Sequence, residues 1–331
     1  MLNYCTLFNS AYLSRGLAMY NSLERCSSNF HLYIFAFDDD CYNCLKELRL
    51  IHATIISLNE FEDEELLSVK PGRTAGEYCW TCTSSTIWYC INTFSLDHCT
   101  YLDADLFFFS DPKVLTDEMG ERSVLITEHR YSPEHDQSAL SGIYCVQFIT
   151  FKNTEQGMKV LNWWRKACLE WCYKRFEDGK FGDQKYLDDW TTRFEGVHVL
   201  QHQGGGVAPW NNLQYEFSGK GTEVTVSTAV SGGKSDLIFY HCHDFRYCLN
   251  GTFRLTAEQY ALKKEVISLI YKPYAKGLAE AEKQIRIVNG NLIFHEPLLN
   301  LDWVMTNIGR KATFTLTGHY KNYYKKRKLE S

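Results

Sequence analysis

The chain has 331 residues, and 45% of them are hydrophobic, so it can form a large domain with a complete core. Its formal net charge of −5 argues against a dedicated nucleic-acid-binding protein, and we expect no nucleic-acid partner. The sequence has no run of about 18 apolar residues, so no membrane-spanning helix is predicted.

Thirteen cysteines are scattered through the chain, an odd number that is typical of reduced thiols in a cytoplasmic protein. Residues 1–10 lack the basic and long apolar regions of a signal peptide, which also favours a cytoplasmic location. Two Cys-x-x-Cys pairs, Cys41 with Cys44 and Cys79 with Cys82, leave a four-cysteine zinc site open. Their apolar, helical surroundings favour ordinary core cysteines.

Predicted strands and predicted helices alternate in the first part of the chain. The predicted strands are residues 4–9, 31–37, 53–58 and 99–109. The predicted helices are residues 14–25, 41–50 and 79–93. This alternation is typical of an α/β protein with a mostly parallel central sheet flanked by helices.

The second part continues the sheet and then becomes helical. Its predicted strands are residues 123–127, 144–151, 197–200 and 237–241. Its predicted helices are residues 154–175, 256–272 and 275–287, the second starting at a capping box of Thr256 and Gln259. We predict a sheet domain over residues 1–250 and a helical C-terminal extension over residues 251–331. A long polar stretch, 128–142, is predicted to be an active-site loop.

The strand at 99–109 contains the stretch YLDADLFFFSDP, in which two carboxylates interrupt an aromatic run. Asp103 and Asp105 are separated by one residue, so on a strand both would lie on the same face. Their repulsion and desolvation would be relieved by a cation, and oxygen ligands suit Mg²⁺ or Mn²⁺. The alternative is a solvated turn in which the two acids have no special role.

Other polar residues stand where predicted strands end, namely Asn9, Asp38, Glu128, His129 and His241. Ligands of open α/β sheets bind beyond the carboxyl ends of the strands, so we expect these residues to share one site. In the late motif LIFYHCHDFR, either His241 or His243 can supply a third metal ligand. The alternative is a pair of polar histidines at a strand end.

Four segments resemble motifs of nucleotide-sugar-dependent glycosyltransferases of the GT-A type, nearest to the retaining galactosyltransferase and glycogenin group. They are CTLFNSAYLSRGLAMYNSL, YLDADLFFFSDP, GDQKYL and YHCHDFR. The resemblance covers about residues 4 to 246. It implies a GT-A, Rossmann-like fold and a retaining hexosyltransferase. The implied donor is a nucleotide-diphosphate sugar, expected to be a UDP-sugar, and the implied acceptor is a glycan or a lipid-linked glycan.

The resemblance also implies roles for individual residues. Asp103, Asp105 and His241 would bind the Mn²⁺ or Mg²⁺ that bridges the donor diphosphate. The residues implied to contact the nucleotide or its phosphates are Asn9, Tyr12, Arg73 and Arg246. Asp183 and Gln184 would flank the anomeric carbon, although Asp183 alone is equally well explained as a helix cap. Where the family has glycine three residues after the late histidine, this chain has Asp244.

Four further residues are candidates for sugar contacts. Glu128, His129 and Arg130 begin the polar loop at the strand ends, so they are expected to contact the donor sugar or the acceptor. Trp210 lies in the glycine-rich segment QGGGVAPWN. It is either a stacking platform for the acceptor or a buried core residue.

The last residues, 319–331, interleave tyrosines with lysines and an arginine. This composition predicts contact with an anionic membrane surface, to which each cation would contribute about 1 kcal/mol. A frayed, solvated tail is the alternative.

Two other functions remain open from the sequence. A nucleotidylyltransferase has a similar sheet but normally carries a basic, glycine-rich loop after its first strand, where this chain has FNSAYLSR. A zinc-bearing interaction protein would use the two Cys-x-x-Cys pairs.

Overall fold

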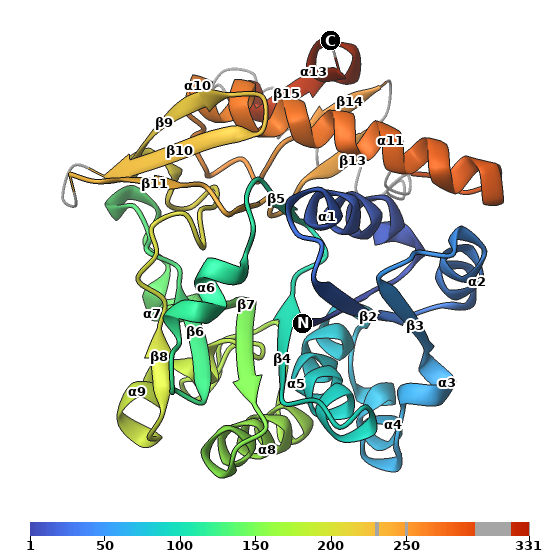
Figure 1. Cartoon of the computed structure of the whole chain (residues 1–331), viewed down its shortest axis with the longest axis vertical. Helices are drawn as coiled ribbons and strands as arrows, with labels where there is room; N and C mark the ends of the chain where they lie inside the picture. Colours follow the sequence, from blue (N-terminus) through green and yellow to red (C-terminus); the bar gives the residue numbers. More distant parts are fainter. Residues whose placement is uncertain (229–231, 249–250, 295–318, 331) are drawn as a thin grey trace.

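A seven-stranded sheet lies at the centre of the protein (Figure 1). The computed structural model describes residues 1–228, 232–248, 251–294 and 319–330. The strand order is β3-β2-β1-β4-β7-β6-β8; β7 is antiparallel to both neighbours, and the other pairs are parallel. The strands are β1 (Leu2–Phe8), β2 (Phe30–Ala36), β3 (Ala53–Ser57), β4 (His98–Leu102), β6 (Val124–Glu128), β7 (Tyr144–Lys152) and β8 (Val197–Val199). The predicted mostly parallel sheet is confirmed.

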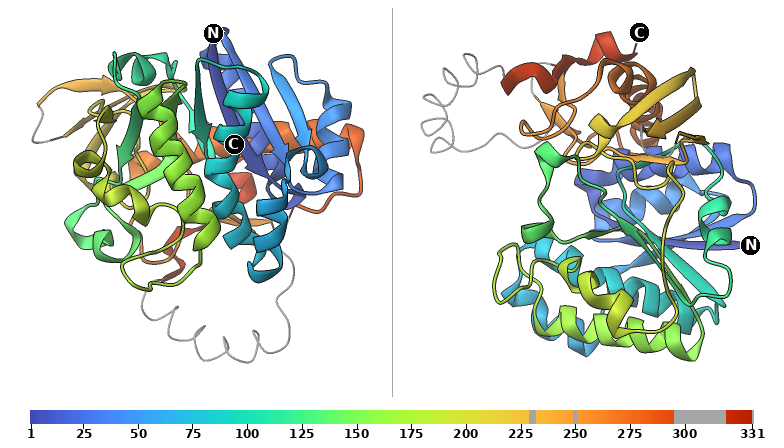
Figure 2. Two further views of the ribbon diagram at one scale, coloured as in Figure 1. Left: turned by 90° about the horizontal axis from the view of Figure 1, so that it is seen from below. Right: turned by 90° about the vertical axis from the view of Figure 1, so that its left-hand side faces the viewer.

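Helices cover both faces of this sheet, and each face has its own apolar core (Figure 2). One face packs against α1 (Leu13–Cys26) and α2 (Asp39–Leu48). The other face packs against α5 (Ala75–Thr93) and α8 (Glu155–Glu170). The shorter helices are α3 (Leu58–Phe61), α4 (Glu64–Val69), α6 (Lys113–Glu118), α7 (Ser138–Ser141) and α9 (Trp190–Arg193).

Local sequence explains where the helices begin. The Thr74 side chain accepts a hydrogen bond from the Glu77 backbone amide, and Glu77 accepts one from the Thr74 amide, which is a complete capping box for α5. Asp38 caps α2 and Thr154 caps α8, each through one side-chain oxygen that accepts a hydrogen bond from a backbone amide of the first turn. Residues 3–8 of β1 are all buried, as expected for an inner strand that is covered on both faces.

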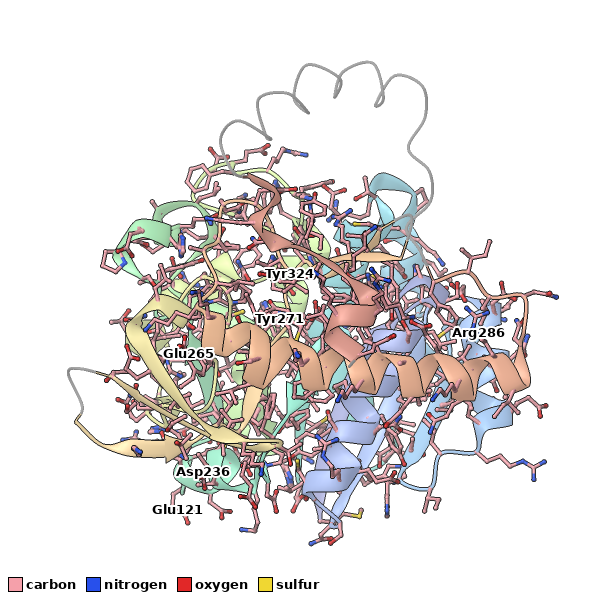
Figure 3. The ribbon with its side chains drawn as sticks, turned by 90° about the horizontal axis from the view of Figure 1, so that it is seen from above. Glu121, Asp236, Glu265, Tyr271, Arg286 and Tyr324 are labelled. Atoms are coloured by element: carbon pink, nitrogen blue, oxygen red, sulfur yellow. The ribbon has the colours of Figure 1, made fainter. Side chains whose placement is uncertain are left out.

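The chain after β8 builds a cap on the α1 side of the sheet (Figure 1). An antiparallel sheet consists of β9 (Tyr215–Lys220), β10 (Glu223–Thr228) and β11 (Lys234–Asp236). Strand β12 (Phe239–His241) pairs with β5 (Leu106–Phe108), and β13 (Arg246–Cys248), β14 (Thr252–Arg254) and β15 (Tyr323–Lys325) form another sheet. The helices here are α10 (Lys264–Val266), a π-helical turn (Ile267–Tyr271), α11 (Lys272–Val288) and α13 (Lys326–Glu330). Figure 3 shows α11 crossing the top of the molecule from Tyr271 towards Arg286.

The C-terminal segment packs against the rest of the protein instead of forming a frayed tail. Tyr323 pairs with Arg254 across β15 and β14, and Leu329 is buried in the core shared with α1. Lys326 forms an ion pair of 2.7 Å with Glu282 of α11. The predicted membrane contact of residues 319–331 stays a prediction, and residue 331 lies outside the described residues. None of the helices in the described ranges has the length and apolar character needed to cross a bilayer.

Several predicted elements were wrong. The predicted helix at 256–272 begins only at Lys264, and the residues before it are irregular. The helix predicted to reach 175 ends at Glu170. The hairpin of β9 and β10 was not predicted. The predicted domain boundary at residue 250 falls on residues 249–250, which are outside the described residues, and it stays a prediction.

Candidate active site at the carboxyl edge of the sheet

The two carboxylates lie in a tight turn between β4 and β5. The predicted single strand at 99–109 was therefore wrong: the Leu106 amide donates to the Asp103 carbonyl (3.2 Å), which closes the turn. The Asp103 amide donates to the Gln147 carbonyl of β7 (3.1 Å), and the Cys242 amide donates to the Asp105 carbonyl (3.0 Å). These backbone bonds fix both aspartates against β7 and the end of β12.

Antiparallel pairing of β12 with β5 brings His241 to the aspartates. Its Nε2 lies 3.1 Å from Asp105 Oδ1 and 3.7 Å from Asp103 Oδ2. Its Nδ1 lies 2.8 Å from Gln147 Oε1. Because an amide oxygen only accepts hydrogen bonds, Nδ1 carries a proton and Nε2 faces the two carboxylates. The predicted group of Asp103, Asp105 and His241 is thus brought together.

His243 joins the same cluster. The ligand atoms of Asp105, His241 and His243 all lie within 4.8 Å of one another. The Trp210 ring contacts both imidazoles, at centroid distances of 5.3 Å to His241 and 5.4 Å to His243. Trp210 is 4% exposed, and its Nε1 donates to the His129 carbonyl (2.9 Å), so the indole is a fixed wall behind both histidines.

The charges of this cluster are poorly solvated. Burial, together with the charge of Asp105, raises the pKa of Asp103 to about 6, although His241 acts against this rise. For Asp105, burial is outweighed by the His241 imidazolium, which lowers the pKa to about 2. The same pairing raises the pKa of His241 well above its usual value in spite of burial. Two carboxylates with an imidazole nitrogen aimed between them form a donor set that fits a divalent cation.

Asp183 lies close enough to Asp103 to feel the charge of its carboxylate. It is buried between α8 and the following turn, and its carbonyl accepts a hydrogen bond from Trp164 Nε1 (2.9 Å). Burial and the charge of Asp103 raise its pKa to about 7. The left-handed backbone of Gly182 (φ +54°), packed on Trp80, makes the bend that turns Asp183 inward.

Gln184 holds the predicted active-site loop. Its Nε2 donates to the Ser141 carbonyl (2.8 Å), and Lys185 Nζ donates to the Ser138 carbonyl (2.8 Å). Asp188 accepts a hydrogen bond from the Ile143 amide (2.7 Å). The polar loop before β7 is therefore fastened to the segment that carries Asp183.

The end of β1 meets the late histidine motif through a residue that the sequence reasoning missed. The Arg15 Nη2 donates to the Phe245 carbonyl (2.9 Å), and its guanidinium lies over the Tyr12 ring at 4.4 Å. Arg15 is buried and its charge helps to lower the pKa of Asp105, after the stronger effects of His241 and His243. Asn9 begins this turn, and its carbonyl accepts a hydrogen bond from the Tyr12 amide (3.0 Å). The sequence feature that could have pointed to Arg15 is a basic residue in the first turn of the first helix.

Two predicted phosphate-binding arginines have other partners. Arg246 Nε lies 2.9 Å from Asp244, which also pairs with Arg254 at 2.6 Å. Asp244 stands where the glycosyltransferase motif that the sequence resembles has glycine, and it has the left-handed φ of +56° that glycine adopts readily. Arg73 stacks on Tyr173 at 3.9 Å and donates to the Leu169 carbonyl (3.2 Å) at the end of α8. These contacts tie Arg73 to α8 and do not bring it to the aspartates.

The remaining predicted contact residues line the loop after β6. Glu128 ends the strand and is half-buried, whereas His129 is buried and stacked on Tyr131 at 4.6 Å. Arg130 donates to the carbonyls of Gly205 and His202, which fastens the glycine-rich loop. His129 and Arg130 thus support the walls of the site. Trp210 is buried, which agrees with the alternative that it is a core residue.

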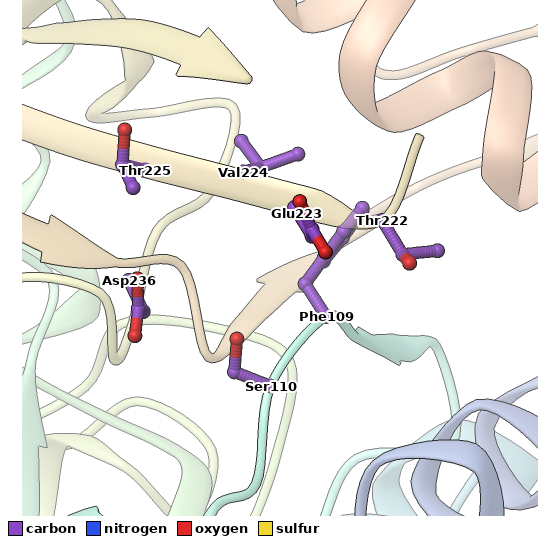
Figure 4. Close-up of a pocket in the computed structure, with 7 residues that line it drawn as sticks. All are labelled: Phe109, Ser110, Thr222, Glu223, Val224, Thr225 and Asp236. Atoms are coloured by element: carbon purple, nitrogen blue, oxygen red, sulfur yellow. The ribbon is translucent and has the colours of Figure 1, made fainter. Parts of the chain in front are cut away.

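Two other features lie apart from this cluster, a surface pocket and a group of buried cysteines. A shallow pocket of about 440 Å³ lies on the β10 side of β5 (Figure 4), and its lining includes Phe109, Glu223 and Asp236 but none of the predicted site residues. Three buried cysteines, from β1, α5 and β4, also have ligand atoms within 4.8 Å of one another; they are Cys5, Cys90 and Cys99. The Cys-x-x-Cys pairs contribute to neither cluster found among the described residues.

Two relatives match most of the chain. The uncharacterized protein YfnD of Bacillus subtilis (strain 168) is 30% identical over 283 residues, which cover 83% of this chain and 88% of YfnD. The uncharacterized protein YfnF of the same strain is 32% identical over 251 residues, which cover 73% of this chain and 81% of YfnF. This chain belongs to the family of YfnD and YfnF. No family model matches the chain.

Several solved structures share a looser similarity with the chain. The glycosyltransferase GlyE of Streptococcus pneumoniae TIGR4 has 14% identity and a TM-score of 0.39, over 62% of this chain and 46% of GlyE. The galactosyltransferase LgtC, in complex with donor and acceptor sugar analogues, has 10% identity and a TM-score of 0.41, over 60% and 73%. Mouse xyloside xylosyltransferase 1 has 12% identity and a TM-score of 0.41, over 60% and 84%. Since these TM-scores are below 0.5, the activity has to be inferred from the site itself.

Proposed function

We propose that this protein is a metal-dependent, retaining hexosyltransferase that moves a sugar from a nucleotide-diphosphate donor, expected to be a UDP-sugar, to a glycan or lipid-linked acceptor. The observation that carries the proposal is the convergence of Asp103, Asp105 and His241 at the carboxyl edge of the sheet, beside the buried carboxyl of Asp183. A bound Mn²⁺ or Mg²⁺ would offset the charge of the leaving diphosphate.

The chain supplies the orientation of this site. Gln147 holds the His241 ring with Nε2 towards the aspartates, at a Nδ1–Oε1 distance of 2.8 Å. In this proposal Asp183 and Gln184 lie beside the anomeric carbon. A side-chain oxygen atom there would stabilise the positive charge that develops on the sugar as the diphosphate leaves. The Ser141 carbonyl holds the Gln184 amide nitrogen, so the amide oxygen is the group presented for this role.

The nucleotide would lie across the turn after β1. Asn9 and Tyr12 are proposed to contact the base and ribose. The Arg15 guanidinium packs on the face of the Tyr12 ring and would hold the ring in place. Arg246 would reach the diphosphate by exchanging its ion pair with Asp244, which keeps a second partner in Arg254. Arg73 would have to break its contacts with Tyr173 and the Leu169 carbonyl before it could reach the nucleotide.

The acceptor would approach the loop that Gln184 fastens. Leu140 and Ile143, in and directly after this loop, are 42% and 44% exposed, so they offer an apolar surface to the carbon-rich face of a sugar. Glu128 ends the strand that leads into the same loop and is proposed to accept hydrogen bonds from sugar hydroxyls. A lipid-linked acceptor would suit membrane contact through the C-terminal cations.

A donor screen tests the proposal. Thermal unfolding is followed with a panel of nucleotide sugars, with and without Mn²⁺, because a ligand that binds only the folded state raises Tm. We expect one donor to raise Tm only with Mn²⁺, and we expect Asp103→Asn or Asp105→Asn to remove that shift and the donor turnover. Asp97→Asn, at the opposite end of β4 and with an exposed side chain, is the matched control. Full turnover in either site variant would refute the proposed role.

The two alternatives are less well supported. The two Cys-x-x-Cys pairs cannot share one zinc ion, since Cys41 and Cys44 lie in the core on the α1 face and Cys82 lies in the core on the α5 face. A nucleotidylyltransferase would form pyrophosphate from a nucleoside triphosphate and a sugar phosphate. Pyrophosphate release in that mixture, without transfer from any nucleotide sugar, would favour this alternative.

A further inference from the structure

We propose that His243 is a second imidazole ligand of the metal ion, next to His241, and that the two imidazoles make the site prefer Mn²⁺ and later first-row ions over Mg²⁺. This inference rests on the proposed function in one respect, because both concern the same bound ion. It adds a fourth ligand to the set of Asp103, Asp105 and His241. It also assigns a preference of the site for Mn²⁺ over Mg²⁺, which follows from that ligand.

The first support is the distance between the donor atoms. Metal–ligand bonds of about 2.1 Å place neighbouring ligands about 3 Å apart and opposite ligands about 4.2 Å apart. His241 Nε2 and Asp105 Oδ1 are separated by 3.1 Å, the spacing of neighbouring ligands. The third donor, on His243, completes a group whose members all lie within 4.8 Å. The three side chains would close on one ion from within this 4.8 Å limit.

The second support is the way in which the His243 ring is held. The Trp210 indole contacts it at 5.4 Å and contacts His241 at 5.3 Å, so one fixed wall sets the positions of both imidazoles. Thr256 Oγ1 donates to the His243 carbonyl (3.0 Å), and the next residue, Asp244, is anchored by Arg254 at 2.6 Å. The carbonyl of His243 and the side chain of the residue after it are thus both held, which limits the movement of the imidazole.

The third support is the availability of the ring nitrogens. His241 uses Nδ1 for Gln147, whereas the His243 ring nitrogens make no hydrogen bond to any residue in the described ranges. His243 is exposed, while Asp105 and His241 are buried. The ion would therefore lie at the boundary of the protein, with its remaining positions open to the donor phosphates and water.

The ligand chemistry sets the selectivity. Mg²⁺ favours an all-oxygen octahedron and keeps several waters, whereas imidazole nitrogen binds first-row transition ions more strongly. Two carboxylates and two imidazoles form a mixed nitrogen and oxygen set. Each imidazole stabilises Mn²⁺, Co²⁺ or Zn²⁺ more than Mg²⁺, so a second imidazole widens the difference in affinity.

The test uses metal binding in the absence of any sugar. Mn²⁺ and Mg²⁺ are titrated calorimetrically into the full chain, its His243→Phe variant and a His31→Gln control, in which the changed residue lies on β2 beside Thr54. Phenylalanine keeps a ring against Trp210 and removes the nitrogen donors. We expect Mn²⁺ affinity to fall at least about tenfold in His243→Phe and Mg²⁺ affinity to fall by a smaller factor. A His243→Gln variant repeats the test if the phenylalanine variant does not fold.

A spectroscopic count of nitrogen ligands completes the test. Electron spin-echo modulation of bound Mn²⁺ should report two imidazole nitrogens in the unmodified chain and one in either His243 variant. Unchanged affinities and an unchanged nitrogen signal in these variants would overturn the inference, and the proposed function would stand if Asp105→Asn still abolished binding. Absence of any Mn²⁺ or Mg²⁺ binding by the unmodified chain would overturn both.

Discussion

Replacing Gly204 by alanine should destabilise the protein and loosen the cluster of Asp103, Asp105 and His241. A Cβ at this position would lie 1.8 Å from the Asp236 carbonyl oxygen and 2.8 Å from its carbon, and both are backbone atoms. Since no flexible side chain can move aside, β11 or the glycine-rich loop has to shift. Overpacking of this kind costs about 1–3 kcal/mol, and the lack of a soft neighbour places Gly204→Ala at about 2 kcal/mol or more.

The shift should reach the site because the same backbone carries β12. The Ile238 amide donates to the Gly204 carbonyl (2.9 Å), and the His241 amide donates to the Val207 carbonyl (2.9 Å). A displaced loop should therefore lengthen the 3.1 Å contact of His241 with Asp105 and weaken metal binding.

Urea unfolding, followed by tryptophan fluorescence, measures the loss of stability in Gly204→Ala, and calorimetry measures the change in Mn²⁺ affinity. The control is Gly72→Ala, whose added Cβ would meet nothing within 4 Å. This control should be within about 0.5 kcal/mol of the unmodified chain or slightly more stable. If Gly204→Ala were as stable as the control and bound Mn²⁺ equally well, the tight loop contact would not exist.

Three further substitutions test other parts of the structure. Thr74→Ala should lower the free energy of unfolding by about 1 kcal/mol through loss of the α5 cap, and an unchanged urea midpoint would contradict the cap. Leu329→Ala should speed amide exchange in α13, because a buried anchor is lost, whereas the exposed Leu67→Ala should leave that exchange unchanged. Arg15→Met should cost about 1–3 kcal/mol by leaving the buried Phe245 carbonyl without its donor, and should weaken donor binding; equal stability would refute the contact.

The central sheet was predictable because its inner strands are continuous apolar runs. β1 shows this in residues 3–8, which are all buried, and the strand ends then place Asp103, Asp105 and His241 at one edge. The motif spacing therefore predicted that Asp103, Asp105 and His241 lie together. It did not show that both aspartates lie in a turn, because this turn is held in place by backbone hydrogen bonds to Gln147 and Cys242, which are far away in the sequence.

The errors came from tertiary contacts that overrode local signals. Thr256 and Gln259 resemble a capping box, but the Thr256 hydroxyl donates to the His243 carbonyl (3.0 Å), and the helix begins only at Lys264. Asn322 donates to the Ala257 and Tyr260 carbonyls, which holds the same segment in an irregular conformation. None of these partners can be recognised from the residues near Thr256.

Arg15 illustrates why part of the site was missed. Its partner, the Phe245 carbonyl, is 230 residues away in the sequence, so nothing near Arg15 indicated a buried position. Trp210 was equally ambiguous, since a tryptophan in a glycine-rich loop suits either a sugar platform or a core. Only the contacts of its ring with both His241 and His243 show what it supports.

The central claim is that Asp103, Asp105 and His241 hold an ion that binds a nucleoside diphosphate. Calorimetric titration of UDP, GDP, ADP, CDP and dTDP, each in Mn²⁺ and in a metal chelator, tests it most directly. We predict that one diphosphate, expected to be UDP, binds the unmodified chain only with Mn²⁺, and that Asp105→Asn removes this binding while Asp97→Asn retains it. Binding of equal strength in the chelator, or in Asp105→Asn with Mn²⁺, would contradict the account.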